Sequence, residues 1–165
     1  TGPIIAAPVG GALPVVWFID RATMTRTDSI ELQAAPYKGV MNSTGTKLFV
    51  DMNNFNMVTI DVPSRTITRT TSVGGTVQAM KMAAGDTLIY VGTRLGTVFE
   101  IDARTSTIRR QFNPSDNVIA LDVSRDGKTL FTTNGGAQVV MTPLAAGGLS
   151  GVVDFSQTAN FSIGG

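Results

Sequence analysis

Short runs of apolar residues, often alternating with polar ones, recur along the whole chain, and turn residues separate them. Runs of this length and alternation are typical of β-strands, whereas no stretch keeps a helical period. The pattern predicts four strands in each of three successive segments: 39–42, 47–51, 57–62 and 66–73; 77–82, 88–92, 98–103 and 107–112; and 118–123, 129–133, 138–142 and 149–155. We therefore expect an all-β protein.

Two sequence markers show that these segments are repeats. The dipeptide Ile-Asp ends at Asp20, Asp61 and Asp102, with a constant spacing of 41 residues. A glycine followed three residues later by leucine occurs at positions 45, 85 and 127, with glycine spacings of 40 and 42 residues. Four antiparallel strands in a period of about 41 residues is the pattern of a β-propeller blade.

Several segments carry a resemblance to a known class of propeller repeats. The best matches are Ser-Arg-Asp-Gly-Lys-Thr-Leu at 124–130, Tyr-Val-Gly-Thr at 90–93, and the strand that ends in Ile-Asp-Ala-Arg-Thr at 101–105. These segments resemble the YVTN and quinoprotein-like propeller repeats. The resemblance implies a β-propeller of four blades, each with four antiparallel strands, and it leaves the function open because such propellers host unrelated activities. The fourth unit departs from it, with Met141-Thr142 where Ile-Asp is expected.

The two ends of the chain are predicted to share one blade. The segment 14–19 aligns with third strands and the segment 4–7 with second strands, so the first unit lacks only its first strand. We expect the C-terminal segment around Phe161–Ile163 to supply that strand. This gives one domain, 1–165, with units at 1–35 plus 159–165, 36–75, 76–115 and 116–158.

Two assemblies follow from this organisation. One is a monomeric four-bladed ring, which the complementary ends of the chain favour, and the other is a two-chain eight-bladed ring. A third alternative is that the chain is a segment of a larger propeller protein.

Composition excludes several classes of function. The 165 residues include no histidine and no cysteine, so a Ser-His-Asp or Cys-His catalytic system and the usual zinc sites are excluded. Any metal would have to be a hard cation held by oxygen, and we expect no metal and no cofactor. A net charge of +1 without charge blocks argues against nucleic-acid binding. Proline and glycine interrupt the uncharged segment 3–19, so we expect no membrane span.

The repeated aspartates have two interpretations. Carboxylates in register on successive blades could line an axis and bind calcium. An aspartate at the end of a strand, followed by a turn and a threonine, more commonly accepts hydrogen bonds from the turn. We favour the turn role for Asp20, Asp61 and Asp102. In the neighbouring strand 14–19, alternation sends Trp17 and Phe18 to opposite faces, and we expect both rings to pack in the core.

Loops between second and third strands, and loops between blades, emerge on one face of a propeller. Phe55, which lies among asparagines on that face, could stack on a sugar or anchor a protein, although asparagine-rich hairpins are also what tight turns need. We expect a non-catalytic binding scaffold that recognises a protein or glycan partner there. The alternative is an enzyme, or part of a quinoprotein-like enzyme, with a cofactor or hard metal ion at the axis. The candidate partner-binding residues are Asn53, Asn54, Phe55, Arg94, Asn134 and Gln138.

The cellular setting follows only from composition. Charged residues make up 15% of the chain, and the strands are rich in threonine. These features favour an extracellular or periplasmic location over the cytoplasm.

Overall fold

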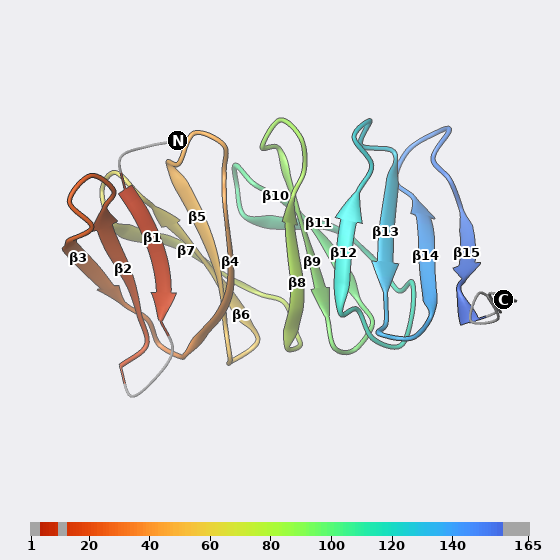
Figure 1. The fold of residues 1–165 in the computed structure, drawn as a ribbon, viewed down its shortest axis with the longest axis horizontal. Helices are drawn as coiled ribbons and strands as arrows, with labels where there is room; N and C mark the ends of the chain where they lie inside the picture. The colour runs from red at the N-terminus through yellow and green to blue at the C-terminus, as the bar shows by residue number, and fades with distance from the viewer. Residues whose placement is uncertain (1–3, 10–12, 157–165) are drawn as a thin grey trace, which may run out of the picture.

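The chain folds into consecutive antiparallel β-sheets, as seen in a computed structural model that describes residues 4–9 and 13–156 (Figure 1). We call the sheets blades 1 to 4 in chain order. Blade 1 has three strands among the described residues, and each of the other blades has four. The strands are β1 (Ile4–Val9), β2 (Val15–Asp20) and β3 (Arg26–Glu31) in blade 1; β4 (Pro36–Met41), β5 (Lys47–Met52), β6 (Asn56–Asp61) and β7 (Thr66–Ser72) in blade 2; β8 (Val77–Met82), β9 (Leu88–Thr93), β10 (Val98–Asp102) and β11 (Thr107–Phe112) in blade 3; and β12 (Ala120–Val123), β13 (Thr129–Thr133), β14 (Gln138–Pro143) and β15 (Gly151–Asp154) in blade 4.

The predicted strand pattern is confirmed, with boundaries that differ by a few residues. The largest difference is in β4, which begins at Pro36 rather than at residue 39 and contains a register shift between Pro36 and Gly39. In blade 1, β1 and β2 take the places of a second and a third strand. Ile4 pairs with Asp20, as Lys47 pairs with Asp61 in blade 2. The predicted closing strand around residues 161–163 lies outside the described residues.

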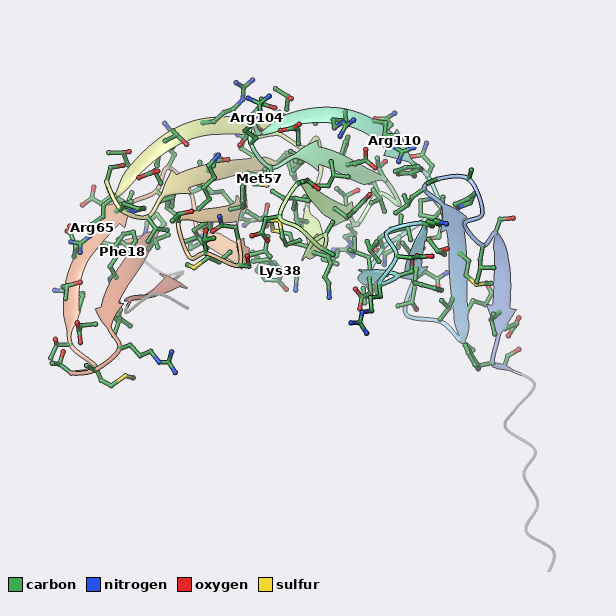
Figure 2. The ribbon with its side chains drawn as sticks, turned by 90° about the horizontal axis from the view of Figure 1, so that it is seen from above. Phe18, Lys38, Met57, Arg65, Arg104 and Arg110 are labelled. Carbon is green, nitrogen blue, oxygen red and sulfur yellow. The ribbon has the colours of Figure 1, made fainter. Side chains whose placement is uncertain are left out.

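Seen from above, the four blades form an open arc, with blade 1 and blade 4 at opposite ends (Figure 2). This differs from the expected ring made by one chain. The main contacts between blades join only sheets that are consecutive in the chain: β1 with β4, β4 with β8, and β8 and β9 with β12. Each junction bends the arc by a limited amount, and three such bends leave the two ends apart.

Alternation along each strand builds the junctions between blades, because successive side chains point to opposite faces of the sheet. In β5, Phe49 packs in the core shared with blade 3, whereas Val50 packs in the core shared with blade 1. Tyr90 of β9 packs in the third core, beside Leu130 of blade 4. Each blade therefore has one apolar face for the blade before it and another for the blade after it.

In β2 the same alternation separates the two aromatic rings. Phe18 is buried between blades 1 and 2, as expected. Trp17 points to the other face and is only partly buried, with the guanidinium carbon of Arg26 5.3 Å from the centre of its ring. Core packing of Trp17 is thus incomplete, because no blade covers this face among the described residues.

The turn role of the repeated aspartates is confirmed. Oδ1 of Asp20 accepts hydrogen bonds from the backbone N–H groups of Ala22 and Thr23, and Oδ1 of Asp61 accepts from the N–H and the hydroxyl of Ser64. Oδ1 of Asp102 does the same in blade 3. These bonds hold the pKa of each of the three carboxyls below its usual value. A register shift occurs just before the isoleucine of each Ile-Asp pair, so the three blades share one local geometry.

Candidate functional site

A pocket of about 290 Å³ lies between blades 2 and 3. One side of the pocket belongs to blade 2 and the other to blade 3, and an equivalent backbone hydrogen bond holds the loop on each side. The N–H of Asn53 donates to the carbonyl of Ala35 at 2.8 Å in blade 2, and the N–H of Arg94 donates to the carbonyl of Thr76 at 2.8 Å in blade 3. Each bond ties the loop after a second strand to the segment that enters the same blade. The pocket is lined by Ala35, Pro36, Tyr37, Asp51, Asn53, Thr76, Gln78 and Arg94.

Asp51 is the unusual member of this pocket. Its side chain comes from β5, its residue is only 2% exposed, and its Oδ1 has no hydrogen-bond partner among the described residues. Burial raises the pKa of Asp51 from 3.8 to about 7, although the charge of Lys38 and a hydrogen bond from the N–H of Met52 act in the opposite direction. The pocket therefore holds a carboxyl that changes protonation near neutral pH.

Comparison with the next junction explains why there is space at Asp51. The corresponding position of blade 3 is Gly92, which pairs with Val98 as Asp51 pairs with Met57. A Cβ atom on Gly92 would lie 2.5 Å from Cγ1 of Val118, so side chains of blade 4 fill that space completely. The junction between blades 2 and 3 instead has a carboxyl and a pocket of about 290 Å³ at this place.

The structure brings together two of the six predicted site residues. Asn53 and Arg94 line the same pocket, and both side chains are exposed. Phe55 lies outside it, at the tip of the hairpin between β5 and β6, and is 51% exposed. Its φ of 65° is in the left-handed region, where the corresponding residue of blade 3 is Gly96. An aromatic residue in this conformation is uncommon, because a Cβ makes the left-handed region costly.

The other three predicted residues make hydrogen bonds within their own blades. The side-chain oxygen of Asn54 accepts from the N–H of Asn56, and that of Asn134 accepts from the N–H of Gly136. Nε2 of Gln138 donates to Asp154 at 2.9 Å. The bonds of Asn54 and Asn134 fit the turn interpretation of the asparagine-rich loops. The partner-binding role of all six residues stays a prediction.

Sequence reasoning missed Asp51 and Gln78 as parts of one site. A signal for Asp51 was present, because it interrupts the apolar run Leu48-Phe49-Val50 at a position where alternation requires a core-facing residue. Charged residues are rarely buried without a partner, so such a position marks a candidate site. Gln78 carried no comparable signal, since polar residues are common in the half-exposed first strands.

A second polar cluster among the described residues is internally paired. A hollow of about 410 Å³ near the opposite end of the blades contains Ser43, Asp86 and Lys81. There the Ser43 hydroxyl donates to Asp86, and Lys81 forms an ion pair with Asp122 at 2.9 Å. Among the described residues, no group of three or more acidic side chains has the geometry to hold a metal ion. The described part of the chain also has no helix with the length and apolar character needed to cross a membrane.

Comparison with known proteins identifies the fold. No protein-family model and no curated protein sequence matches the chain. Among solved structures, hydrazine synthase of Kuenenia stuttgartiensis is similar, with a TM-score of 0.74 and 21% sequence identity over 85% of this chain. The fold is that of a β-propeller. The match covers 43% of the hydrazine synthase chain, so this chain spans less than half of that protein's length. At this level of identity the likeness describes fold and not activity, and it does not distinguish YVTN repeats from other propeller repeats.

Proposed function

We propose that the chain is a non-catalytic binding scaffold that recognises a protein or glycan partner through the loop face of blades 2 and 3. The observation that carries this proposal is the pocket lined by Asn53, Arg94 and Asp51, in which Oδ1 of the Asp51 carboxyl has no hydrogen-bond partner among the described residues. A buried polar atom without a hydrogen-bond partner is costly, and a donor group of a ligand would relieve that cost.

The chemistry of the lining suits a partner rich in hydroxyl or amide groups. Asn53 and Gln78 each supply one amide donor group and one carbonyl acceptor, Arg94 supplies a cationic donor, and Asp51 supplies an acceptor. The ring of Tyr37 is exposed at the rim, with Nζ of Lys38 5.2 Å from its centre. A volume of about 290 Å³ is close to the lower end for ligand pockets, which fits one sugar ring or one side chain of a larger partner.

Phe55 extends the proposed binding surface beyond the pocket. Its exposed ring is held in a conformation that costs free energy, and such strain persists at positions where the surroundings or a function maintain it. A ring in this position can stack on a sugar or insert into a protein surface. The threonine-rich strands and low charge described above support an extracellular or periplasmic setting for this activity.

Chemical-shift mapping of the ¹⁵N-labelled chain tests this proposal, with a panel of hexoses, N-acetylhexosamines and short peptides as probes. We expect at least one probe to shift the signals of Asn53, Gln78 and Arg94. The double variant Phe55→Ala, Arg94→Ala should abolish the shifts and leave the melting temperature nearly unchanged. The control is Arg125→Ala, an exposed arginine at the opposite end of the blades, which should bind as the unmodified chain does. Shifts that cluster instead around Lys81 and Arg125, or binding that survives the double variant, would show that the wrong face has been chosen.

A further inference from the structure

Blade 4 lies at one end of the arc and has an apolar face that is partly exposed. In blades 2 and 3 the equivalent face is buried by the blade that follows. The aromatic residue of the second strand shows this most clearly. Phe49 in blade 2 and Tyr90 in blade 3 are buried by the following blade. Phe131 of β13 has the same register position and is partly exposed, because no blade follows it among the described residues.

The third strand repeats the pattern. Met57 and Val98 are fully buried at the junctions that follow blades 2 and 3, whereas Val139 of β14 is partly exposed at the equivalent position. Val139 pairs with Val153 of β15, which is 40% exposed on the same face of the sheet. A shallow hollow of about 200 Å³, lined in part by Phe131 and Val139, lies on this face. Blade 4 thus presents the same kind of surface that blades 2 and 3 present to the blade that covers them.

Blade 1 ends the other side of the arc with the complementary kind of face. Ile60 of blade 2 and Ile101 of blade 3 are fully buried against the blade before them. The equivalent residue of blade 1 is Ile19, which is partly exposed beside Trp17. Blade 1 therefore exposes, at the start of the arc, apolar side chains whose equivalents in blades 2 and 3 are buried.

The turn after each Ile-Asp pair adds a second contact to the preceding blade. The fourth residue after each Ile-Asp pair is left-handed in all three blades, and in two of them its side chain contacts the preceding blade. Arg65 of blade 2 forms an ion pair with Asp28 of blade 1 at 2.6 Å, and the Ser106 hydroxyl of blade 3 lies 2.7 Å from that of Thr59 in blade 2. The equivalent residue of blade 1 is Met24, which is 68% exposed.

We propose that blade 4 of one chain docks on blade 1 of a second copy, and that the reciprocal contact closes an eight-bladed ring of two chains. The occupant is a second copy because the two open faces are the two halves of a junction that the chain already builds three times. The open arc holds these faces apart within one chain (Figure 2). A head-to-tail interface of this kind forms a closed ring when its rotation returns to the start, and eight blades lie within the range of known propellers.

One position departs from the internal junctions. Val62, Ala103 and Leu144, which follow the third strands of blades 2, 3 and 4, are buried against the preceding blade. Blade 1 has the exposed Arg21 there. Its aliphatic stem can cover apolar surface while the guanidinium reaches water, so the junction between copies is more polar at its edge than the internal ones.

Light scattering during size-exclusion chromatography of the 165-residue chain tests the assembly. The expected mass is twice the 17.3 kDa of one chain. A monomer over the accessible concentration range would overturn the docking of copies. A ladder of larger species would overturn closure by two chains.

Two substitutions test the head-to-tail arrangement. Val139→Glu places a charge on the blade 4 face, and Ile19→Glu places one on the blade 1 face, where the equivalent Ile60 and Ile101 are fully buried, so each should halve the measured mass. Val152→Glu is the matched control, because Val152 is exposed on the opposite face of β15 and its substitution should leave the mass unchanged. Far-ultraviolet circular dichroism verifies that each variant keeps its strands. Dissociation by only one of the two face variants would contradict the proposal.

Trp17 reports the direction of docking, because it is the only tryptophan and lies on the blade 1 face. Val139→Glu, at the other end of the arc, should shift the Trp17 emission to longer wavelength, since the tryptophan of the second copy loses its cover. A contact between two blade 4 faces would also be broken by Val139→Glu, but the emission would not change. An unchanged emission spectrum in a dissociated variant would therefore refute head-to-tail docking.

Discussion

Asp51→Asn should change how the stability of the chain depends on pH. The carboxyl is buried, and its pKa is raised from 3.8 to about 7 in the folded state. Because the folded state then binds the proton more tightly than the unfolded state, this group contributes most stability at low pH. That contribution is lost as the pH rises from the unfolded pKa through the folded one. Asparagine has almost the same shape and does not titrate, so the variant should lack this dependence.

The magnitude follows from the two pKa values. A difference of about three pKa units corresponds to about 4 kcal/mol over the full range, of which about 3 kcal/mol falls between pH 5 and pH 8. Urea unfolding at several pH values in this interval measures it. The free energy of unfolding of Asp51→Asn, minus that of the unmodified chain, should rise by about 3 kcal/mol from pH 5 to pH 8.

The control is Asp28→Asn. Asp28 is paired with Arg65, and that guanidinium holds the pKa of Asp28 below its usual value, so its titration lies below this pH interval. The difference between Asp28→Asn and the unmodified chain should therefore stay constant from pH 5 to pH 8. If the Asp51→Asn difference is constant as well, the carboxyl is ionised throughout, and the reasoning from its burial is wrong.

Two further predictions concern the junction between blades 3 and 4. Arg110→Met removes the partner that donates to the buried Glu100 at 2.8 Å and leaves it, among the described residues, only the Tyr90 hydroxyl at 2.9 Å. Because Arg110 is itself half exposed, we expect a loss of about 2 kcal/mol in urea unfolding, below the range for fully buried pairs, and adding Glu100→Gln should recover most of it. Gly92→Ala places a methyl group 2.5 Å from Cγ1 of Val118 and should cost about 1–3 kcal/mol, whereas Gly75→Ala, with its nearest atom at 3.4 Å, is the control with a small effect. Equal melting temperatures for the two glycine variants would show that Val118 can move aside.

The strands could be predicted from sequence because their pattern is local. Alternation within each strand and glycine in each turn locate β9 and β13 to within one residue. The 41-residue period then identifies the blade as the repeating unit. The turn role of Asp61 was predictable for the same reason, since its partner Ser64 is only three residues away.

The open arc and the pocket could not be predicted in this way, because both depend on packing between blades. Whether a junction is filled depends on residues that are far apart in sequence, such as Gly92 and Val118. Asp51 and Gln78 meet only because blades 2 and 3 bend toward each other by a particular amount. Among the predicted loop residues, the sequence could not distinguish Asn53, which lines the pocket, from Asn54, whose side-chain oxygen accepts a hydrogen bond from its own turn.

The restriction of contacts to consecutive blades has a consequence for how the chain opens. Blades 2 and 3 are each held on two sides, whereas blades 1 and 4 are each held on one side in the isolated arc. In arrays with only nearest-neighbour contacts, stability is a sum over units and interfaces, so a unit with one interface opens more often. Amide hydrogens of β13 should then exchange faster than those of β5 and β9, although all three are second strands. Unfolding would begin in blades 1 and 4. A partner that covered one of these two blades would slow amide hydrogen exchange in that blade before it slowed exchange in the others.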